Sequence, residues 1–130
     1  MNVVGIIAEY NPFHNGHVYQ INKIKKLFKN SIIIVILNGN FTQRADVSVI
    51  NKWDKTRILL DNNVDMVVEL PIYYGINNAD IFAEGALKIL NELKIDTLVF
   101  LITIFLIPAF IIVFLHIAHG LASLTYSPVL

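Results

Sequence analysis

Hydrophobic residues follow two different patterns along the first part of the chain. Four short and almost wholly apolar runs are typical of strands buried on both faces of a parallel sheet; they cover residues 3–8, 32–37, 65–71 and 96–100. Between these runs, apolar residues recur every three or four positions, which predicts amphipathic helices that begin at Val18, span about 51–62 and span 79–93. The alternation of strands and helices predicts an α/β protein with three layers and a parallel sheet.

The helical patterns also predict which side chains are buried. The apolar face of the first helix consists of Val18, Ile21, Ile24 and Phe28, and that of the last helix of Phe82, Ala86, Ile89 and Leu93. In the middle helix, we expect Trp53 in the core and Lys52 and Lys55 on a solvated face. Asp80 is expected in the first turn of the last helix, where a carboxylate complements the helix dipole.

The pattern changes after Asp96, the last acidic or basic residue. Only Thr103 and Pro108 interrupt the apolar run over residues 98–115, which is long enough for a transmembrane helix. Three interpretations stay open, in order of preference: a truncated or frame-altered product whose tail has no selected role, a membrane anchor over residues 98–119 that leaves the preceding domain in the cytoplasm, and a strand followed by a buried helix. His116 and His119 are interpreted as the end of this segment.

Composition narrows the functions that the chain can have. Ten acidic and ten basic residues cancel, so net charge does not attract the molecule to nucleic acids or membranes. The chain has no cysteine, which excludes disulfides, thiolate metal sites and cysteine nucleophiles. Its N-terminus has neither a basic segment nor a cleavage-like site, so we expect no signal peptide and a cytoplasmic protein.

Candidate chemistry is concentrated where the first strand meets the first helix. His14 and His17 flank Gly16 at the point where the helical pattern begins. A helix N-terminus offers unpaired N–H groups that bind phosphates, and imidazoles can donate hydrogen bonds to phosphate oxygens and stabilise charge at an attacked α-phosphate. Zinc binding is a less favoured alternative, because Glu9 is the only obvious third ligand; a purely polar surface loop is the other alternative. We therefore predict a nucleotide-binding loop.

The motif His14-Asn15-Gly16-His17 resembles the His-x-Gly-His signature of the nucleotidyltransferase superfamily. The longer run from Gly5 to His17 resembles the N-terminus of the bacterial tRNA(Met) cytidine acetate ligases, and the likeness continues through residues 38–44, 51–53, 64–71 and 79–83 to residue 100. The resemblance implies a Rossmann-like nucleotidyltransferase core. It also implies two regions, an ATP-binding domain over residues 1–100 that is incomplete and an apolar tail over residues 101–130 that is unrelated to the family.

The resemblance further implies an activity. Enzymes of that family use ATP to activate acetate as acetyl-adenylate, and then acetylate the N4 amine of the wobble cytidine of elongator tRNA(Met). It implies that His14 and His17 are catalytic residues that contact the phosphates and stabilise the adenylation transition state, with Mg²⁺ as a helper of the triphosphate. The implied ATP-binding residues are Ile7, Ala8, Glu9, Tyr10, Asn11, Pro12, Phe13, His14, Asn15, Gly16, His17, Val18, Tyr19 and Gln20.

Arg44 is a further candidate, because it follows the second strand at the carboxyl edge of the sheet, the usual ligand side. Contact with phosphate or RNA and a solvated loop position are equally open for it. Glu69, at the end of the third strand, is either a site carboxylate or a cap.

Two positions depart from the pattern of the family. Ala45 stands where the family usually has a glycine, and Leu101 stands where it has the glycine of a Gly-Ser-Glu turn that helps to hold the nucleotide. We therefore expect part of the nucleotide pocket and the tRNA-binding region to be missing, which would leave the chain without full activity. Two further functions stay open: another adenylyltransferase of the superfamily, and a non-catalytic, membrane-tethered protein that binds nucleotides or RNA.

Overall fold

The computed structural model describes residues 2–102 and 111–116. Its strands and helices alternate over most of this length. In chain order, the elements are β1 (Val3–Ala8), α1 (Asn15–Leu27), β2 (Ile32–Asn38), α2 (Lys52–Asp61), β3 (Met66–Leu70), α3 (Ile72–Gly75), α4 (Ala79–Glu92), β4 (Thr97–Ile102) and β5 (Ile111–His116).

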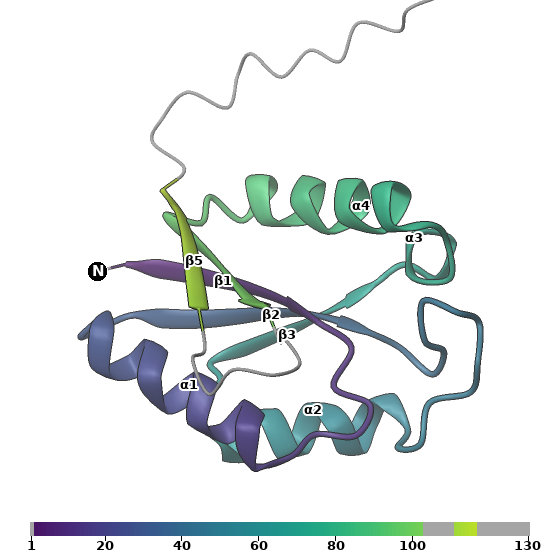
Figure 1. Ribbon diagram of the computed structural model, residues 1–130, viewed down its shortest axis with the longest axis horizontal. Coiled ribbons are helices and arrows are strands. Elements are labelled where there is room, and N and C mark those ends of the chain that lie inside the picture. The colour runs from purple at the N-terminus through teal and green to yellow at the C-terminus, as the bar shows by residue number, and fades with distance from the viewer. Residues whose placement is uncertain (1, 103–110, 117–130) are drawn as a thin grey trace, which may run out of the picture.

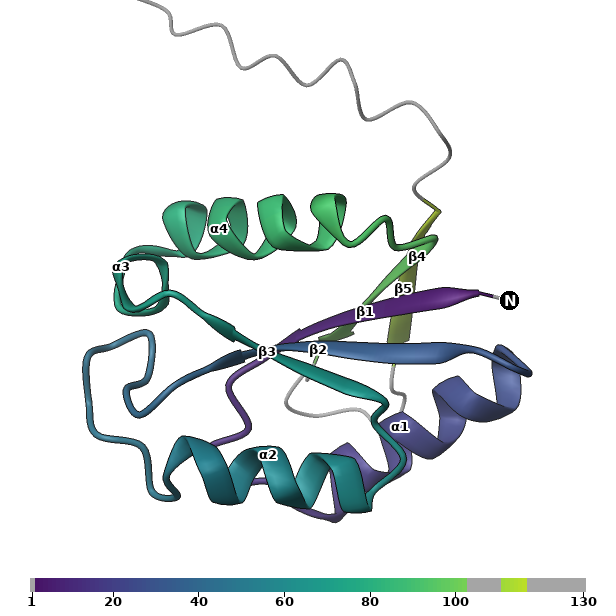
Figure 2. The same ribbon diagram turned by 180° about the vertical axis from the view of Figure 1, so that it is seen from behind.

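The strands form one sheet in the order β3-β2-β1-β4-β5. The first four strands in this order are parallel, and β5 pairs with β4 in the antiparallel direction. Helices α1 and α2 cover one face of the sheet, and α3 and α4 cover the other (Figures 1 and 2). The α/β fold with three layers and a parallel sheet is thus confirmed.

Alternate residues of the strands supply two hydrophobic clusters, one on each face, because successive strand side chains point to opposite sides. Val35 lies in the cluster under α1 and α2, together with Ile21, Ile24 and Leu59. The next residue of β2, Ile36, lies in the cluster under α4, which includes Leu70, Ala86, Leu90 and Leu98. The predicted face of α4 is confirmed, since Phe82, Ile89 and Leu93 pack against this second cluster.

The strand order changes direction beside β1. The chain moves from β1 to β2 and β3 on one side, and then crosses to β4 on the other side of β1. In open parallel sheets, ligands bind outside the carboxyl ends of the strands at such a reversal. The fold therefore places the end of β1, and the loop that follows it, at the position expected for a ligand.

Two predictions about α2 are wrong. Trp53 is 71% exposed, and Lys55 is only 1% exposed. Lys55 and Leu59 are four residues apart and share the buried face. Trp53 lies two residues before Lys55, so its side chain points away from that face, and the Lys52 ammonium lies 5.3 Å from its ring centroid. Asp80 does lie in the first turn of α4, as predicted.

The transmembrane interpretation of the C-terminal run is wrong for residues 98–102 and 111–116, which belong to β4 and β5. A short apolar run rich in β-branched and aromatic residues suits a buried strand as well as a helix, so periodicity cannot separate the two. No helix in the described part of the chain is long and apolar enough to cross a bilayer. Residues 103–110 and 117–130, with His119, lie outside the described residues, and the division at residue 100 stays a prediction.

Candidate nucleotide-binding site

The site is built where the chain leaves β1 and enters α1. Residue His14 has an extended backbone (φ −146°, ψ 174°) and is the N-cap of α1, so the helix begins at Asn15. The sequence pattern predicts a start at Val18, because the apolar period begins there. The helix starts three residues earlier because the imidazoles of His14 and His17 supply the capping interactions.

Both histidines bond to the helix backbone through the same ring atom. The Gly16 N–H donates to Nδ1 of His14 at 3.1 Å, and the His14 N–H donates to Nδ1 of His17 at 3.2 Å. This reciprocal arrangement is a capping box in which imidazoles replace the usual hydroxyl and carboxylate groups. A ring nitrogen that accepts a hydrogen bond carries no proton, so the neutral rings hold their protons on Nε2.

The two imidazoles stack on each other. Their ring centroids lie 3.7 Å apart, and the ring planes are inclined by 27°. Burial, together with a smaller effect of the nearby His14, lowers the pKa of His17 to about 4. His17 is therefore neutral at physiological pH, and its Nε2–H is a neutral hydrogen-bond donor.

Gly16 makes the stacked arrangement possible. A Cβ atom at this position would lie 2.9 Å from Cε1 and 3.1 Å from Nδ1 of His14. The His14 ring thus occupies the space of the missing side chain. A glycine is therefore required at this position because the His14 ring packs against it. This requirement does not depend on a ligand.

These contacts change the predicted binding chemistry of the helix N-terminus. The N–H of Gly16 is bonded to the His14 ring, and the N–H groups of His17 and Val18 are bonded to the His14 carbonyl at 2.8 and 3.2 Å. The expectation that the backbone N–H groups at this helix start are unpaired is therefore wrong for these three residues. The Nε2–H groups of the histidines remain as donors, at the end of the helix where the dipole favours anions.

Aromatic side chains support His17 from the interior. The Tyr10 ring lies edge-on to His17 with a centroid distance of 4.6 Å, and edge-on to Phe13 at 5.2 Å. Tyr10 is 5% exposed, and burial raises the pKa of its hydroxyl. Its backbone has a φ of 46°, in the left-handed region that a side chain disfavours. The loop holds this conformation while Tyr10 packs in the core beneath the histidines.

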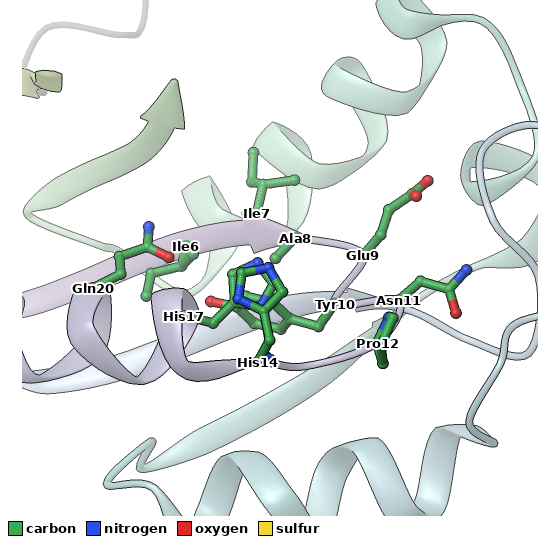
Figure 3. Close-up of a pocket in the computed structure, with 10 residues that line it drawn as sticks. All are labelled: Ile6, Ile7, Ala8, Glu9, Tyr10, Asn11, Pro12, His14, His17 and Gln20. Carbon is green, nitrogen blue, oxygen red and sulfur yellow. The ribbon is translucent and has the colours of Figure 1, made fainter. Parts of the chain in front are cut away.

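The loop after β1 is tied to the loop after β2 through two polar side chains. Oε1 of Glu9 accepts hydrogen bonds from the Gln43 N–H at 2.6 Å and from Nδ2 of Asn38 at 3.2 Å. Oδ1 of Asn11 accepts from the Val49 N–H at 2.7 Å and from the Ser48 hydroxyl at 3.0 Å. Glu9 and Asn11 extend away from the two imidazoles (Figure 3). Both side chains thus hold the loop in place.

A pocket of about 580 Å³ opens beside the histidines (Figure 3). Its wall contains both imidazoles and the carboxyl end of β1. Most of the predicted ATP-binding residues line it, and Ile6 is added to them; the lining consists of Ile6, Ile7, Ala8, Glu9, Tyr10, Asn11, Pro12, His14, His17 and Gln20. Phe13, Asn15, Gly16, Val18 and Tyr19 belong to the predicted segment but do not line the pocket.

The family comparison agrees with this geometry. The model of the HIGH nucleotidyl transferase family matches residues 1–103. The chain belongs to this family. The matched residues include the four parallel strands of the sheet. His14 and His17 are the two histidines of the motif His-Asn-Gly-His.

Curated relatives resemble the chain over three-quarters of its length. A tRNA(Met) cytidine acetate ligase from Halothermothrix orenii is 50% identical over 101 residues, which cover 77% of this chain and 24% of the relative. The protein of the same name from Ligilactobacillus salivarius is 50% identical over 100 residues, or 77% of this chain and 26% of the relative. The chain therefore spans about a quarter of the length of these relatives.

A solved structure has the same fold. TmcAL from Thermotoga maritima, crystallised with alpha-thio ATP, is 42% identical and aligns with a TM-score of 0.67 over 70% of this chain and 22% of its own. The apo form of the same protein gives the same values.

Other candidate residues of this HIGH nucleotidyl transferase lie apart from the pocket. Arg44 is exposed and does not line it, although the neighbouring Gln43 contacts Glu9. Glu69 forms an ion pair with Lys52 at 2.7 Å, which places it beside α2. Among the described residues, no group of three histidines or carboxylates is placed to hold a metal ion.

One residue next to the site was missed by the sequence analysis. Nζ of Lys55 donates hydrogen bonds to the carbonyls of Asn38 and Gly39 at 2.9 Å and of Glu9 at 3.3 Å. The signal was present in the helical period, since Lys55 lies four residues before the buried Leu59 and therefore on the same face. The sequence analysis missed the burial of Lys55 because lysine side chains are usually solvated.

Proposed function

We propose that this chain provides the ATP-binding part of an ATP-dependent ligase that acetylates the wobble cytidine of elongator tRNA(Met). The observation that supports it best is the stacked pair His14 and His17, which offers two Nε2–H donors to one pocket at the carboxyl end of β1. The names of the relatives supply the class of substrates, and the ATP analogue bound to the Thermotoga protein agrees with a nucleotide in this pocket.

The proposed reaction has two steps. An acetate oxygen attacks the α-phosphorus of ATP, the bond to pyrophosphate breaks, and acetyl-AMP forms. The N4 amine of the cytidine then attacks the acetyl carbonyl, AMP leaves, and the nitrogen loses a proton. The Nε2–H groups of His14 and His17 stabilise the negative charge that develops on the phosphate oxygens in the first step, as preorganised donors do.

The remaining substrates and contacts belong to the same proposal. The residues from Ile7 to Gln20 form the ATP-binding segment, and Arg44 contacts phosphate or RNA from its exposed loop. Mg²⁺ is part of this proposal as a helper of the triphosphate, whose charge it would partly neutralise. We place the protein in the cytoplasm, where tRNA is modified.

Activity of the whole enzyme needs more than this chain, since the chain corresponds to about a quarter of its relatives. The direct experiment is therefore made in two proteins, the chain itself and a chimaera that joins residues 1–100 to the remaining part of the Halothermothrix relative. We expect the chain to bind ATP and the chimaera to form acetyl-AMP from ATP and acetate.

In the chimaera, His14→Ala and His17→Ala should each lower the rate of acetyl-AMP formation about a hundredfold, the usual effect of removing one preorganised donor. Lys23→Ala, on the exposed face of α1, is the matched control. Unchanged rates in both histidine variants would refute their role. Adenylation of another acceptor, with no acetyl-AMP, would instead assign the chain to a different adenylyltransferase.

A further inference from the structure

The buried ammonium group of Lys55 connects the ends of the two central strands. Lys55 reaches from α2 to the carbonyls of Asn38 and Gly39, at the end of β2, and of Glu9, just after β1. Its three ammonium protons match these three acceptors. A lysine that is 1% exposed is rare, because burial of a charge is unfavourable unless all its hydrogen bonds are made.

The three carbonyls belong to the segments that shape the pocket. Glu9 begins the loop that ends at His14, and the side chain of Glu9 is bonded to Asn38 and Gln43. Asn38 and Gly39 begin the loop whose residues Ser48 and Val49 hold Asn11. Lys55 therefore fixes the start of both loops relative to α2. Burial lowers the pKa of Lys55, and the carboxylates of Glu9 and Glu69 oppose this effect without cancelling it.

We propose that Lys55 is a positioning residue of the nucleotide site, whose ammonium holds the ends of β1 and β2 so that the following loop presents His14 and His17 to the pocket. This inference rests on the proposed function. Lys55 does not line the pocket, so its effect on the nucleotide is transmitted through the loop.

Lys25 offers a control at the opposite, N-terminal ends of the strands. Its Nζ donates to the Ser31 carbonyl at 3.1 Å and to Oδ2 of Asp65 at 2.6 Å, just before β2 and β3 begin. Lys25 is thus another lysine that joins a helix to two strands. A purely structural role of Lys55 predicts that Lys25→Met and Lys55→Met have similar effects on ATP binding.

The experiment compares wild type, Lys55→Met, Lys55→Arg and Lys25→Met at a temperature at which circular dichroism shows each to be folded. Calorimetry measures ATP binding, and ¹⁵N NMR of the imidazoles reports the hydrogen bonds of His14 and His17. We expect Lys55→Met to weaken ATP binding about tenfold or more, since small misplacements of binding groups are costly. It should also shift both imidazole signals. Lys55→Arg, which retains the charge and the donors, should stay within about threefold of wild type.

Lys25→Met should lower the unfolding temperature but leave ATP affinity within about twofold of wild type, as expected of a distant and independent site. Equal loss of affinity in Lys25→Met and Lys55→Met would overturn the proposal, as would wild-type binding by Lys55→Met. The outcomes separate the two hypotheses: a wild-type chain that does not bind ATP contradicts the proposed function, whereas unshifted imidazole signals in Lys55→Met contradict the role of Lys55.

A measurement on the wild-type chain covers the case in which Lys55→Met does not fold. Saturation with ATP should shift the ¹⁵Nζ signal of Lys55 and slow the exchange of its protons, because the loop that it holds contacts the ligand. The ¹⁵Nζ signal of Lys25 should stay unchanged. A Lys55 signal that is indifferent to bound ATP would overturn the proposal.

Discussion

Gly16 is the residue on which the geometry of the histidine pair depends most directly. In Gly16→Ala, the new Cβ would lie 2.9 Å from Cε1 of His14 and would displace that ring from its stack with His17. We predict that ATP binding weakens about tenfold, because a displaced donor no longer meets the phosphate. The helix should still form, because the higher helix propensity of alanine offsets part of the lost capping bond between the Gly16 N–H and the His14 ring. Calorimetric titration with ATP, with Lys23→Ala as the control, tests this; equal affinity in both variants would contradict it.

His17 makes the stability of the fold depend on pH. Its pKa is about 4 in the folded protein and about 6.5 in an unfolded chain, so the unfolded state binds the proton more readily between these values. The free energy of unfolding should therefore fall as the pH is lowered from 6.5 to 4. Denaturant unfolding at several pH values measures the slope.

The matched variant for this pH dependence is His17→Asn, which keeps a polar side chain but cannot take up the proton. It should show a smaller slope over the same pH interval. Identical slopes in the two proteins would mean that His17 is not the group that titrates.

The role of the histidines could be predicted from the sequence only in part. The sequence placed His14 and His17 together where the first helical pattern begins, and the two rings do stack there. The sequence could not show that their Nδ1 atoms cap the helix, because this depends on the extended backbone at His14 and on the tight fit over Gly16. Of the two kinds of donor expected from the sequence, the imidazole N–H groups remain available, while the N–H groups of Gly16, His17 and Val18 are already paired.

At the scale of elements, the loop after β2 contains a turn in which the Ala45 N–H donates to the Thr42 carbonyl at 2.9 Å. Ala45 has a φ of 64°, in the left-handed region that favours glycine. Ala45→Gly should raise the free energy of unfolding by about 1 kcal/mol. The substitution removes the strain of a left-handed alanine, and the greater conformational entropy of glycine in the unfolded chain cancels part of this gain. Thermal and denaturant unfolding measure the change, with Asp46→Gly as the control for added flexibility. A loss of stability in Ala45→Gly would contradict the strain.

The apolar periods predicted which segments are strands and which are helices, but they did not predict which side chains of α2 are buried. The period predicted a helix there, and α2 spans Lys52–Asp61. It could not show that a lysine takes the buried place and a tryptophan the exposed one, because the partners of Lys55 are carbonyls from two distant strands. The short helix α3 was missed as well, since four residues are too few for a period to emerge.

For the whole molecule, the described residues place a pocket at the carboxyl end of β1, in a sheet with four parallel strands. The fold predicted for the first hundred residues is confirmed, and the similarity to the Thermotoga structure covers 70% of the chain. The described lining of the pocket comes from β1, the loop that follows it and α1. This agrees with a proposal in which residues beyond this quarter of the relatives' length complete the site.

The pairing of β1 with β4 has a consequence for the order in which the protein can be completed during synthesis. The Val3 N–H donates to Oδ2 of Asp96 at 2.7 Å, and the Asp96 N–H donates to the Val3 carbonyl at 2.8 Å, across 93 positions of sequence. One edge of β1 therefore stays unpaired until β4 has left the ribosome. β1 is translated well before the strand that covers its second edge, and the nascent chain is prone to wrong strand pairing during that interval.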